Sequence, residues 1–155
     1  MVTKIISGAQ TGADRAGLDA ALALGLEVGG WLPLGKRTDD GPLSLEDFSR
    51  YKLREHPSSG YPGRTEQNVR EADGTVIFGN PYSPGCSLTL RLCEKHHKEW
   101  LIMEDKDVAY SPRELRKWLD AQGVKVLNVA GNRERKSPGI YKLTYNVLLE
   151  ALNNG

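Results

Sequence analysis

The sequence has little cysteine, no long apolar run and almost no net charge. Its 155 residues contain only two cysteines, Cys86 and Cys93, and such a pair gives no disulfide framework. No apolar segment is long enough to cross a bilayer, and the first residues lack the pattern of a secretory signal. A net charge of +1 does not supply the basic surface that is typical of nucleic-acid-binding proteins. We therefore expect a cytoplasmic, reduced protein without membrane or nucleic-acid partners.

The rest of the composition is that of a soluble globular protein. Hydrophobic residues make up 39% of the chain and charged residues 26%. A chain of this length folds as one domain and can bury a substantial core. The 17 glycines cluster near the ends of expected strands and do not form a linker. We therefore treat residues 1–155 as a single ligand-binding domain.

Short apolar segments alternate with helical patterns along the chain. We expect strands at 4–7, 28–32, 51–55, 75–78, 100–103 and 124–129. We expect helices at 14–24, 43–50, 64–73, 87–98, 111–122 and 140–152. Thr65 is the expected N-cap of the third helix. This alternation predicts an α/β fold, a Rossmann-like three-layer sandwich with a mostly parallel sheet and helices on both faces.

The first strand leads into a glycine-containing turn and then a helix. In this layout the unpaired N–H groups and partial positive charge of the helix N-terminus attract an anion. Gly8 and Gly12 allow the backbone to approach a ligand closely, and Ser7 and Thr11 add hydroxyl donors. The turn has neither the three glycines of a dinucleotide site nor the Gly-Lys-Ser/Thr ending of a P-loop. It predicts phosphate binding, with an ordinary tight turn as the alternative.

Two further polar junctions, 79–87 and 130–139, also follow strands. Because ligands of open parallel sheets bind outside the carboxyl ends of the strands, we expect all three junctions to form one site. In the third junction Arg133 is expected to face this site, while Arg135 and Lys136 point to solvent.

A long polar loop at 33–42 is bounded by prolines. Loops of this length inside a compact domain are usually functional or disordered. Lys36, Arg37 and Thr38 could contact an anion, and a solvated charge run is the alternative.

Several stretches of the chain resemble the family of molybdenum carrier proteins. They are Ser7–Ala16, Trp31–Pro33, Arg37–Gly41, Arg64–Val69, Pro84–Thr89 and Asn128–Gly131. They follow one another in the family's order over nearly the whole chain. The resemblance implies a Rossmann-like domain related to the nucleotide-binding phosphoribohydrolases that activate cytokinins. It also implies that the ligand is the molybdenum cofactor (molybdopterin, a pterin with a phosphate group) or a phosphorylated nucleotide.

The resemblance further implies which residues bind this ligand. The first loop would hold phosphate, helix 64–73 would line the pocket, residues 85–89 would form a second phosphate-facing turn, and residues 131–133 would close the site. Arginine suits such a role because its guanidinium binds phosphate through two hydrogen bonds. The expected ligand-binding residues are Ser7, Gly8, Ala9, Gln10, Thr11, Gly12, Arg15, Lys36, Arg37, Thr38, Arg64, Thr65, Asn68, Asn80, Gly85, Ser87, Thr89, Gly131, Asn132 and Arg133.

The same resemblance raises the question of catalysis. The related hydrolases carry the pattern Pro-Gly-Gly-x-Gly-Thr-x-x-Glu, whose carboxylate assists cleavage of a glycosidic bond. This chain keeps Pro84, Gly85 and Thr89 but has Leu92 at the position of the carboxylate. General acid or base chemistry is therefore lost there. We expect a carrier or binding protein without catalytic residues, with a small nucleotide hydrolase or a nucleotide sensor as the alternatives.

Other residue types could support catalysis or metal binding. Asp14, Glu66 or Glu134 could replace the missing carboxylate from other loops. Cys93 and His96 stand three residues apart on an expected helix but lack a third ligand, so we expect no metal site.

A further cysteine and two tyrosines have simpler interpretations. Cys86 begins a helix, where a thiolate is favoured, and a partly buried small residue is the simpler interpretation. Tyr141 and Tyr145 share a face of the last helix and suit packing or an interface. We expect a homo-oligomer.

Overall fold

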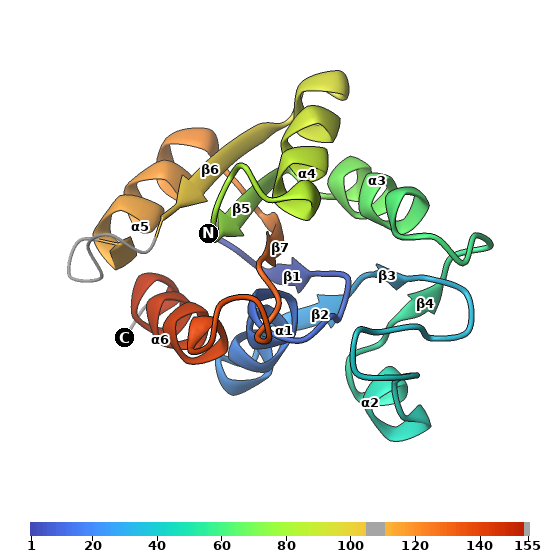
Figure 1. Ribbon diagram of the computed structural model, residues 1–155. Coiled ribbons are helices and arrows are strands. Elements are labelled where there is room, and N and C mark those ends of the chain that lie inside the picture. Colours follow the sequence, from blue (N-terminus) through green and yellow to red (C-terminus); the bar gives the residue numbers. More distant parts are fainter. Residues whose placement is uncertain (105–110, 154–155) are drawn as a thin grey trace.

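The computed structural model describes residues 1–104 and 111–153, and its centre is a five-stranded parallel sheet (Figure 1). The strands are β1 (Lys4–Ile6), β2 (Glu27–Gly29), β5 (Gly74–Phe78), β6 (Glu99–Met103) and β7 (Val126–Gly131). Their order is β2-β1-β7-β5-β6, so the last strand of the chain lies in the middle. Ile5 pairs with Val28 on one side and Leu127 on the other, and Val76 pairs with Val129. The carboxyl ends of β1, β7 and β5 therefore meet at one edge of the sheet.

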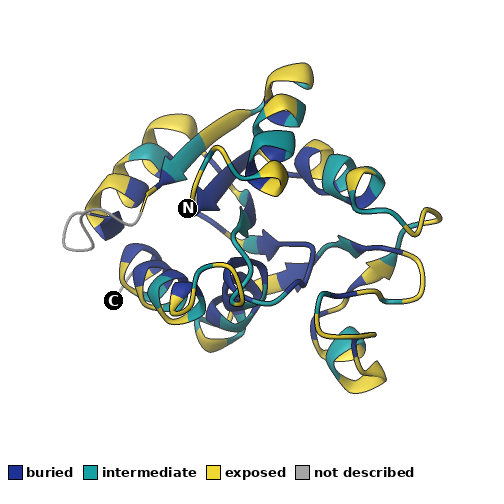
Figure 2. Cartoon of the chain, in the orientation of Figure 1, coloured by how far each residue is buried: buried dark blue, intermediate teal, exposed yellow. Residues whose placement is uncertain are grey.

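Helices cover both faces of this sheet. On one face α1 (Ala13–Ala23), α5 (Ser111–Gln122) and α6 (Ile140–Leu152) pack together. On the other face lie α3 (Tyr61–Glu71) and α4 (Pro84–Lys95). Figure 2 shows the buried residues gathered on inner strands of the sheet such as β1 and β5 and on the inner sides of the helices, while the edge strand β6 is largely exposed or intermediate. The three-layer, Rossmann-like fold that the sequence predicts is confirmed. In the part of the chain that the structure describes, no helix is long and apolar enough to cross a membrane.

A second, two-stranded sheet replaces part of one expected strand. The chain leaves the main sheet at Gly30, and β3 (Trp31–Leu32) pairs in parallel with β4 (Arg54–Glu55). Gly30 has φ +130°, and a Cβ there would lie 2.1 Å from the carbonyl oxygen of Ser7. Only glycine fits this combination of conformation and contact, so the strand predicted at 28–32 is divided. Helix α2 (Leu45–Arg50) lies between these two strands in the sequence.

Two helices near the sheet edge begin earlier than the sequence predicts. Helix α3 begins at Tyr61 after the N-cap Gly60, so the prediction of Thr65 as N-cap is wrong. The hydroxyl of Thr65 lies inside the helix and donates to the carbonyl oxygen of Tyr61 (2.9 Å). Helix α4 begins at Pro84. In both helices a proline in the first turn marks the start, because its missing N–H has no intrahelical partner there.

Candidate ligand-binding site

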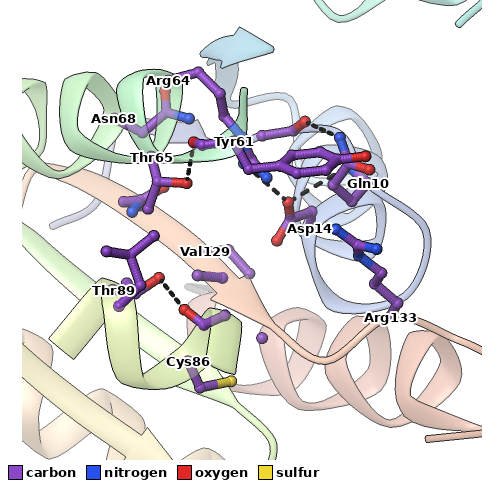
Figure 3. A pocket seen from close by; sticks show the side chains of 16 residues that line it. Gln10, Asp14, Tyr61, Arg64, Thr65, Asn68, Cys86, Thr89, Val129 and Arg133 are labelled. Atoms are coloured by element: carbon purple, nitrogen blue, oxygen red, sulfur yellow. Dashed lines mark hydrogen bonds and ion pairs between the residues drawn. The ribbon is translucent and has the colours of Figure 1, made fainter. Parts of the chain in front are cut away.

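A cavity lies at the carboxyl ends of β1 and β7, beside the first turns of α1, α3 and α4 (Figure 3). Val129 of β7 lies behind it, while side chains of α3 and α4 approach from two sides. The residues that line it are Gly8, Gln10, Asp14, Tyr61, Arg64, Thr65, Asn68, Gly85, Cys86, Leu88, Thr89, Asn128, Val129, Ala130, Gly131 and Arg133. All three polar junctions contribute to this set, as the parallel-sheet argument predicts.

The structure brings about half of the expected ligand-binding residues to this cavity. Those that line it are Gly8, Gln10, Arg64, Thr65, Asn68, Gly85, Thr89, Gly131 and Arg133. Asn132 lies at its mouth, among the residues of an adjoining hollow. The expected residues outside the lining are Ser7, Ala9, Thr11, Gly12, Arg15, Lys36, Arg37, Thr38, Asn80 and Ser87.

A buried ion pair lies inside the cavity. Nη1 of Arg64 is 3.6 Å from Oδ2 of Asp14, and the two side chains are only 10% and 9% exposed. Burial raises the pKa of Asp14 although the guanidinium beside it opposes this shift. Within residues 1–104 and 111–153, Nε of Arg64 has no hydrogen-bond partner. The cavity thus holds a cation whose hydrogen-bonding capacity is only partly used.

Gly8 makes room for this ion pair. A Cβ at Gly8 would lie 1.5 Å from Nη1 of Arg64, so the absent side chain leaves space for the guanidinium. The sequence predicts that Gly8 lets the backbone approach a ligand. In the structure, the missing side chain of Gly8 leaves the space that the Arg64 guanidinium occupies.

Tyr61 lies at the centre of a group of guanidinium groups. The guanidinium carbons of Arg133, Arg37 and Arg64 lie 4.7, 4.8 and 5.3 Å from the centre of its ring. Such distances are typical of cation–π attraction. Three segments that are distant in the sequence therefore place positive charge around one ring at the edge of the cavity.

The first turn of α1 already contacts a carboxylate. Asp39 accepts hydrogen bonds from the N–H of Thr11 (3.0 Å) and from its hydroxyl (2.6 Å). Burial acts against ionisation of Asp39, but the Thr11 hydrogen bonds outweigh it and lower the pKa. The N–H of Ala13, two residues later, donates to the carbonyl oxygen of Asn132 (3.2 Å). At Thr11 the anion is therefore a side chain of the protein itself.

The proline-bounded loop is tied to the turn before α1. The side-chain amide nitrogen of Gln10 donates to the carbonyl oxygen of Arg37 (3.1 Å). Arg15 forms an ion pair with Asp40 (3.5 Å) and donates to the carbonyl oxygen of Ala9 (3.1 Å). The hydroxyl of Thr38 donates to Asp40 (2.6 Å). These contacts explain why the loop carries polar residues, and they hold it against the sheet edge.

Three other expected residues lie away from the cavity. Lys36 forms an ion pair with Glu55 (3.2 Å). Asn80 is exposed, and its side chain accepts the N–H of Tyr82 (2.9 Å). The N–H of Ser87 donates to the carbonyl oxygen of Ser83 (2.8 Å) inside the first turn of α4.

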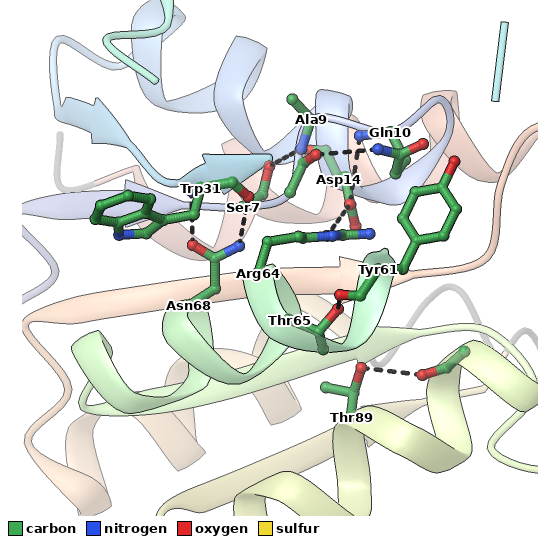
Figure 4. A network of polar contacts seen from close by, with 12 residues as sticks. Ser7, Ala9, Gln10, Asp14, Trp31, Tyr61, Arg64, Thr65, Asn68 and Thr89 are labelled. Atoms are coloured by element: carbon green, nitrogen blue, oxygen red, sulfur yellow. Dashed lines mark hydrogen bonds and ion pairs between the residues drawn. The ribbon is translucent and has the colours of Figure 1, made fainter. Parts of the chain in front are cut away.

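Asn68 lines the cavity while its amide joins two elements (Figure 4). Its oxygen accepts the N–H of Trp31 (2.9 Å), and its nitrogen donates to the carbonyl oxygen of the same residue (3.0 Å). The side chain thus fixes α3 against β3. This pairing positions Arg64, which lies one turn earlier on the helix.

The first turn of α4 has no side-chain cap. The hydroxyl of its N-cap, Ser83, instead donates to the carbonyl oxygen of Asn80 (2.8 Å) and to Asn132 (3.3 Å). Gly85 is exposed and a Cβ there would meet nothing within 4 Å. The positive end of this helix dipole therefore faces the cavity without a side chain over it.

Asn132 connects the second and third junctions. Its amide oxygen also accepts from the thiol of Cys86 (3.3 Å), and its amide nitrogen donates to the hydroxyl of Ser137 (2.8 Å). Burial raises the pKa of the Cys86 thiol, so the neutral form is favoured. This environment fits the interpretation of Cys86 as a small, buried residue, although Cys86 also lines the cavity.

Of the carboxylates considered for catalysis, Asp14 alone lines the cavity. Glu66 pairs with Lys95 and His96 at 2.8 Å, and these partners lower its pKa to about 2. Glu134 accepts the backbone N–H groups of Gly139 (2.6 Å) and Tyr141 (2.9 Å) at the start of α6. Leu92 is not among the lining residues.

Metal-binding side chains do not gather in the described chain. Among residues 1–104 and 111–153, no group of three or more His, Cys, Asp or Glu side chains could hold a metal ion. Cys93 is buried, and His96 faces Glu66.

Comparison with known proteins agrees with this architecture. A family model described as the circularly permutated YpsA SLOG family matches residues 5–152. The chain belongs to this family. A solved structure of a putative molybdenum carrier protein from Syntrophus aciditrophicus SB is similar over 98% of this chain and 96% of that chain, with 37% identity and a TM-score of 0.90. A comparison with curated proteins found no match. The resemblance to molybdenum carrier proteins that the sequence indicates is thereby confirmed.

Several cavity residues of this SLOG protein were missed by sequence reasoning. They are Tyr61, Leu88, Asn128, Val129 and Ala130, while the sequence indicated Asp14 only as a possible replacement carboxylate and Cys86 only as a thiolate or a small buried residue. For Tyr61 the available signal was Pro62, which marks the helix start and so places Tyr61 at the sheet edge. For Asp14 no local signal exists, because its role depends on Arg64, 50 positions later.

Proposed function

We propose that this protein binds a small phosphate-bearing ligand in the cavity and acts as a carrier of it. The supporting observation is the buried Arg64 guanidinium, which lines the cavity and has an unused N–H group. Buried cations without full hydrogen bonding are costly unless an anion or a ligand completes them. The molybdenum cofactor is the first candidate, because a relative of 37% identity carries the name molybdenum carrier protein. A phosphorylated nucleotide is the second.

The charges of the lining residues support an anionic ligand. Arg64 and Arg133 are the cations and Asp14 is the anion, so the lining carries one positive charge in excess. The uncapped first turn of α4 adds the partial positive charge of its dipole. We therefore propose that the phosphate lies between Arg64, Arg133 and the turn at Gly85. In this arrangement Thr11 supports the site from behind, where Asp39 contacts it.

Removal of Arg133 should weaken ligand binding strongly. Its guanidinium lines the cavity, whereas Arg135 on the same loop is exposed and outside the lining. A hydrogen bond to a charged group contributes about 1.5–3 kcal/mol, so Arg133→Ala should lower affinity roughly ten- to a hundredfold. Arg135→Ala is the matched control and should change it much less. Isothermal titration calorimetry with AMP measures both, and equal small effects would place the phosphate elsewhere.

One observation favours hydrolysis as a second candidate function. Asp14 is a buried carboxyl inside the cavity, and its raised pKa suits a general acid. Against this, its nearest cationic neighbour is Arg64, and Leu92 stands where the related hydrolases carry their carboxylate.

We expect the purified protein not to turn over nucleoside monophosphates. The measurement is release of ribose 5-phosphate from AMP, GMP, CMP and UMP. Enzymatic rates of roughly one per second or faster would contradict the carrier proposal. Asp14→Asn distinguishes a true activity from a contaminating enzyme, because Asp14 is the only carboxyl of the lining among residues 1–104 and 111–153. Mass spectrometry of the native protein, with a molybdenum assay of the same sample, identifies the cargo.

A further inference from the structure

The phosphate cavity continues outward into a hollow between the first turns of α3 and α4. We call this hollow the mouth. It shares Tyr61, Gly85, Cys86, Leu88, Gly131 and Arg133 with the cavity. The residues that the mouth adds are Pro62, Ser83, Pro84, Asn132 and Lys136. A ligand whose phosphate reaches Arg64 therefore has its remaining atoms in the mouth.

The two walls of the mouth are apolar. Tyr61 and Pro62 come from the start of α3, and Pro84 and Leu88 from the start of α4. Pro84 and Leu88 are four residues apart and so lie on the same face of the helix. Arg133, Arg37 and Arg64 lie 4.7, 4.8 and 5.3 Å from the centre of the Tyr61 ring, so this wall offers the guanidinium plane of Arg133 over the tyrosine. Flat heterocycles bind to proteins by stacking on aromatic side chains and on arginine planes.

Asn132 and Ser83, two polar side chains of the mouth, are already hydrogen-bonded to protein groups. The amide of Asn132 has three partners in Ser83, Cys86 and Ser137. The hydroxyl of Ser83 also donates to the carbonyl oxygen of Asn80. Lys136 is exposed at the rim. Side chains that are already hydrogen-bonded to the protein form few hydrogen bonds to the edge of a ligand ring. Discrimination between rings by hydrogen bonding requires groups that would be left unpaired by the wrong ligand.

From these walls and contacts we infer that the mouth is a stacking site for the flat ring of the phosphate-bearing ligand. The ring lies between Pro62 and the Arg133 guanidinium that covers Tyr61 on one side and Pro84 with Leu88 on the other. The site selects for a flat ring attached to a phosphate and discriminates little between rings of similar size. This inference rests on the proposed function, because it requires the phosphate to lie in the cavity.

The test compares three probes by isothermal titration calorimetry on the full chain. Ribose 5-phosphate carries the phosphate without a ring, and AMP and GMP add rings with different edges. We expect AMP and GMP to bind roughly ten- to a hundredfold more tightly than ribose 5-phosphate, since stacking of one base contributes a free energy of this size. The affinities for AMP and GMP should agree within about threefold.

A variant separates the two parts of the ligand. Pro62→Ser should weaken AMP and GMP binding about threefold and leave ribose 5-phosphate binding unchanged, because Pro62 lines the mouth and is not among the lining residues of the cavity. Leu45→Ser is the control, because Leu45 is 74% exposed on α2 and outside both hollows. Thermal melting shows that each variant is folded.

The outcomes distinguish the inference from the proposal on which it rests. If ribose 5-phosphate binds and AMP binds no more tightly, the stacking site is wrong and the phosphate site stands. If the affinities for AMP and GMP differ by more than about tenfold, the site distinguishes the hydrogen-bonding edges of the two rings and the inference is overturned. If no phosphate compound binds to the folded protein, both the proposed function and the inference fail.

Discussion

Replacement of Arg64 with methionine is expected to destabilise the fold by about 3–5 kcal/mol at neutral pH. The methionine fills much of the space of the arginine stem, so the main loss is the charge. Asp14 then remains nine-tenths buried without its partner 3.6 Å away. Urea denaturation at pH 7 measures the loss. Arg70→Met is the matched control, because Arg70 lies on the same helix and is exposed.

The loss at Arg64 should depend on pH in one direction. Burial raises the pKa of Asp14 above its ordinary value of 3.8, and Arg64 opposes this rise. A carboxyl whose pKa is raised on folding favours the folded state at acid pH, and this contribution is lost as the pH rises through the folded pKa. Without Arg64 the pKa rises further, so the variant loses more stability than the wild type between about pH 4 and pH 7. The deficit of Arg64→Met should therefore shrink at about pH 4.5. An equal deficit at both pH values would mean that Asp14 is not the cause.

Replacement of Gly12 with alanine should destabilise the protein far more than the same change at Gly25. Both glycines have positive φ, +82° and +72°. A Cβ at Gly12 would lie 2.4 Å from the carbonyl oxygen of Asn132, whereas at Gly25 nothing lies within 4 Å. The φ strain alone costs roughly 1–2 kcal/mol, and forced overpacking adds about 1–3 kcal/mol.

The two glycine variants differ in contact and hardly in conformation. Gly25→Ala should thus show the strain alone, and Gly12→Ala the strain with the collision. The measurement is the free energy of unfolding in urea. Equal losses in the two variants would mean that the third junction yields easily and does not hold the first turn of α1 in place.

The sequence predicted the fold because its signals are local or periodic. Alternation of apolar strands with helical patterns predicted a parallel sheet, and parallel strands bring their carboxyl ends together whatever the details of each loop. This reasoning alone brought Gly8 and Gly131 to one cavity, and it predicted Arg133 at the cavity with Arg135 exposed.

The parts of the site that were not predictable depend on contacts between distant segments. A turn before a helix looks open in a sequence, but Asp39, 28 residues after Thr11, occupies it in the structure. Asn68 looks like a free amide, but the backbone of Trp31 uses both of its polar atoms. The partners of such groups are set by tertiary packing, so neither hydrophobic periodicity nor a helix-capping pattern in the sequence predicts them.

The central place of β7 has a consequence for how the protein is made. Residues of β1 and β5 leave the ribosome long before β7, yet neither strand pairs with the other. Until Val126–Gly131 emerges, the native partners available are β2 for β1 and β6 for β5, so at most two separate strand pairs can form. Each pair then exposes an inner edge, on β1 or on β5, that β7 covers in the finished sheet, and open strand edges are places where chains aggregate. Synthesis of this one late strand fills the gap between the two pairs and completes the lining of the cavity at the same time, so an incomplete chain has no complete cavity.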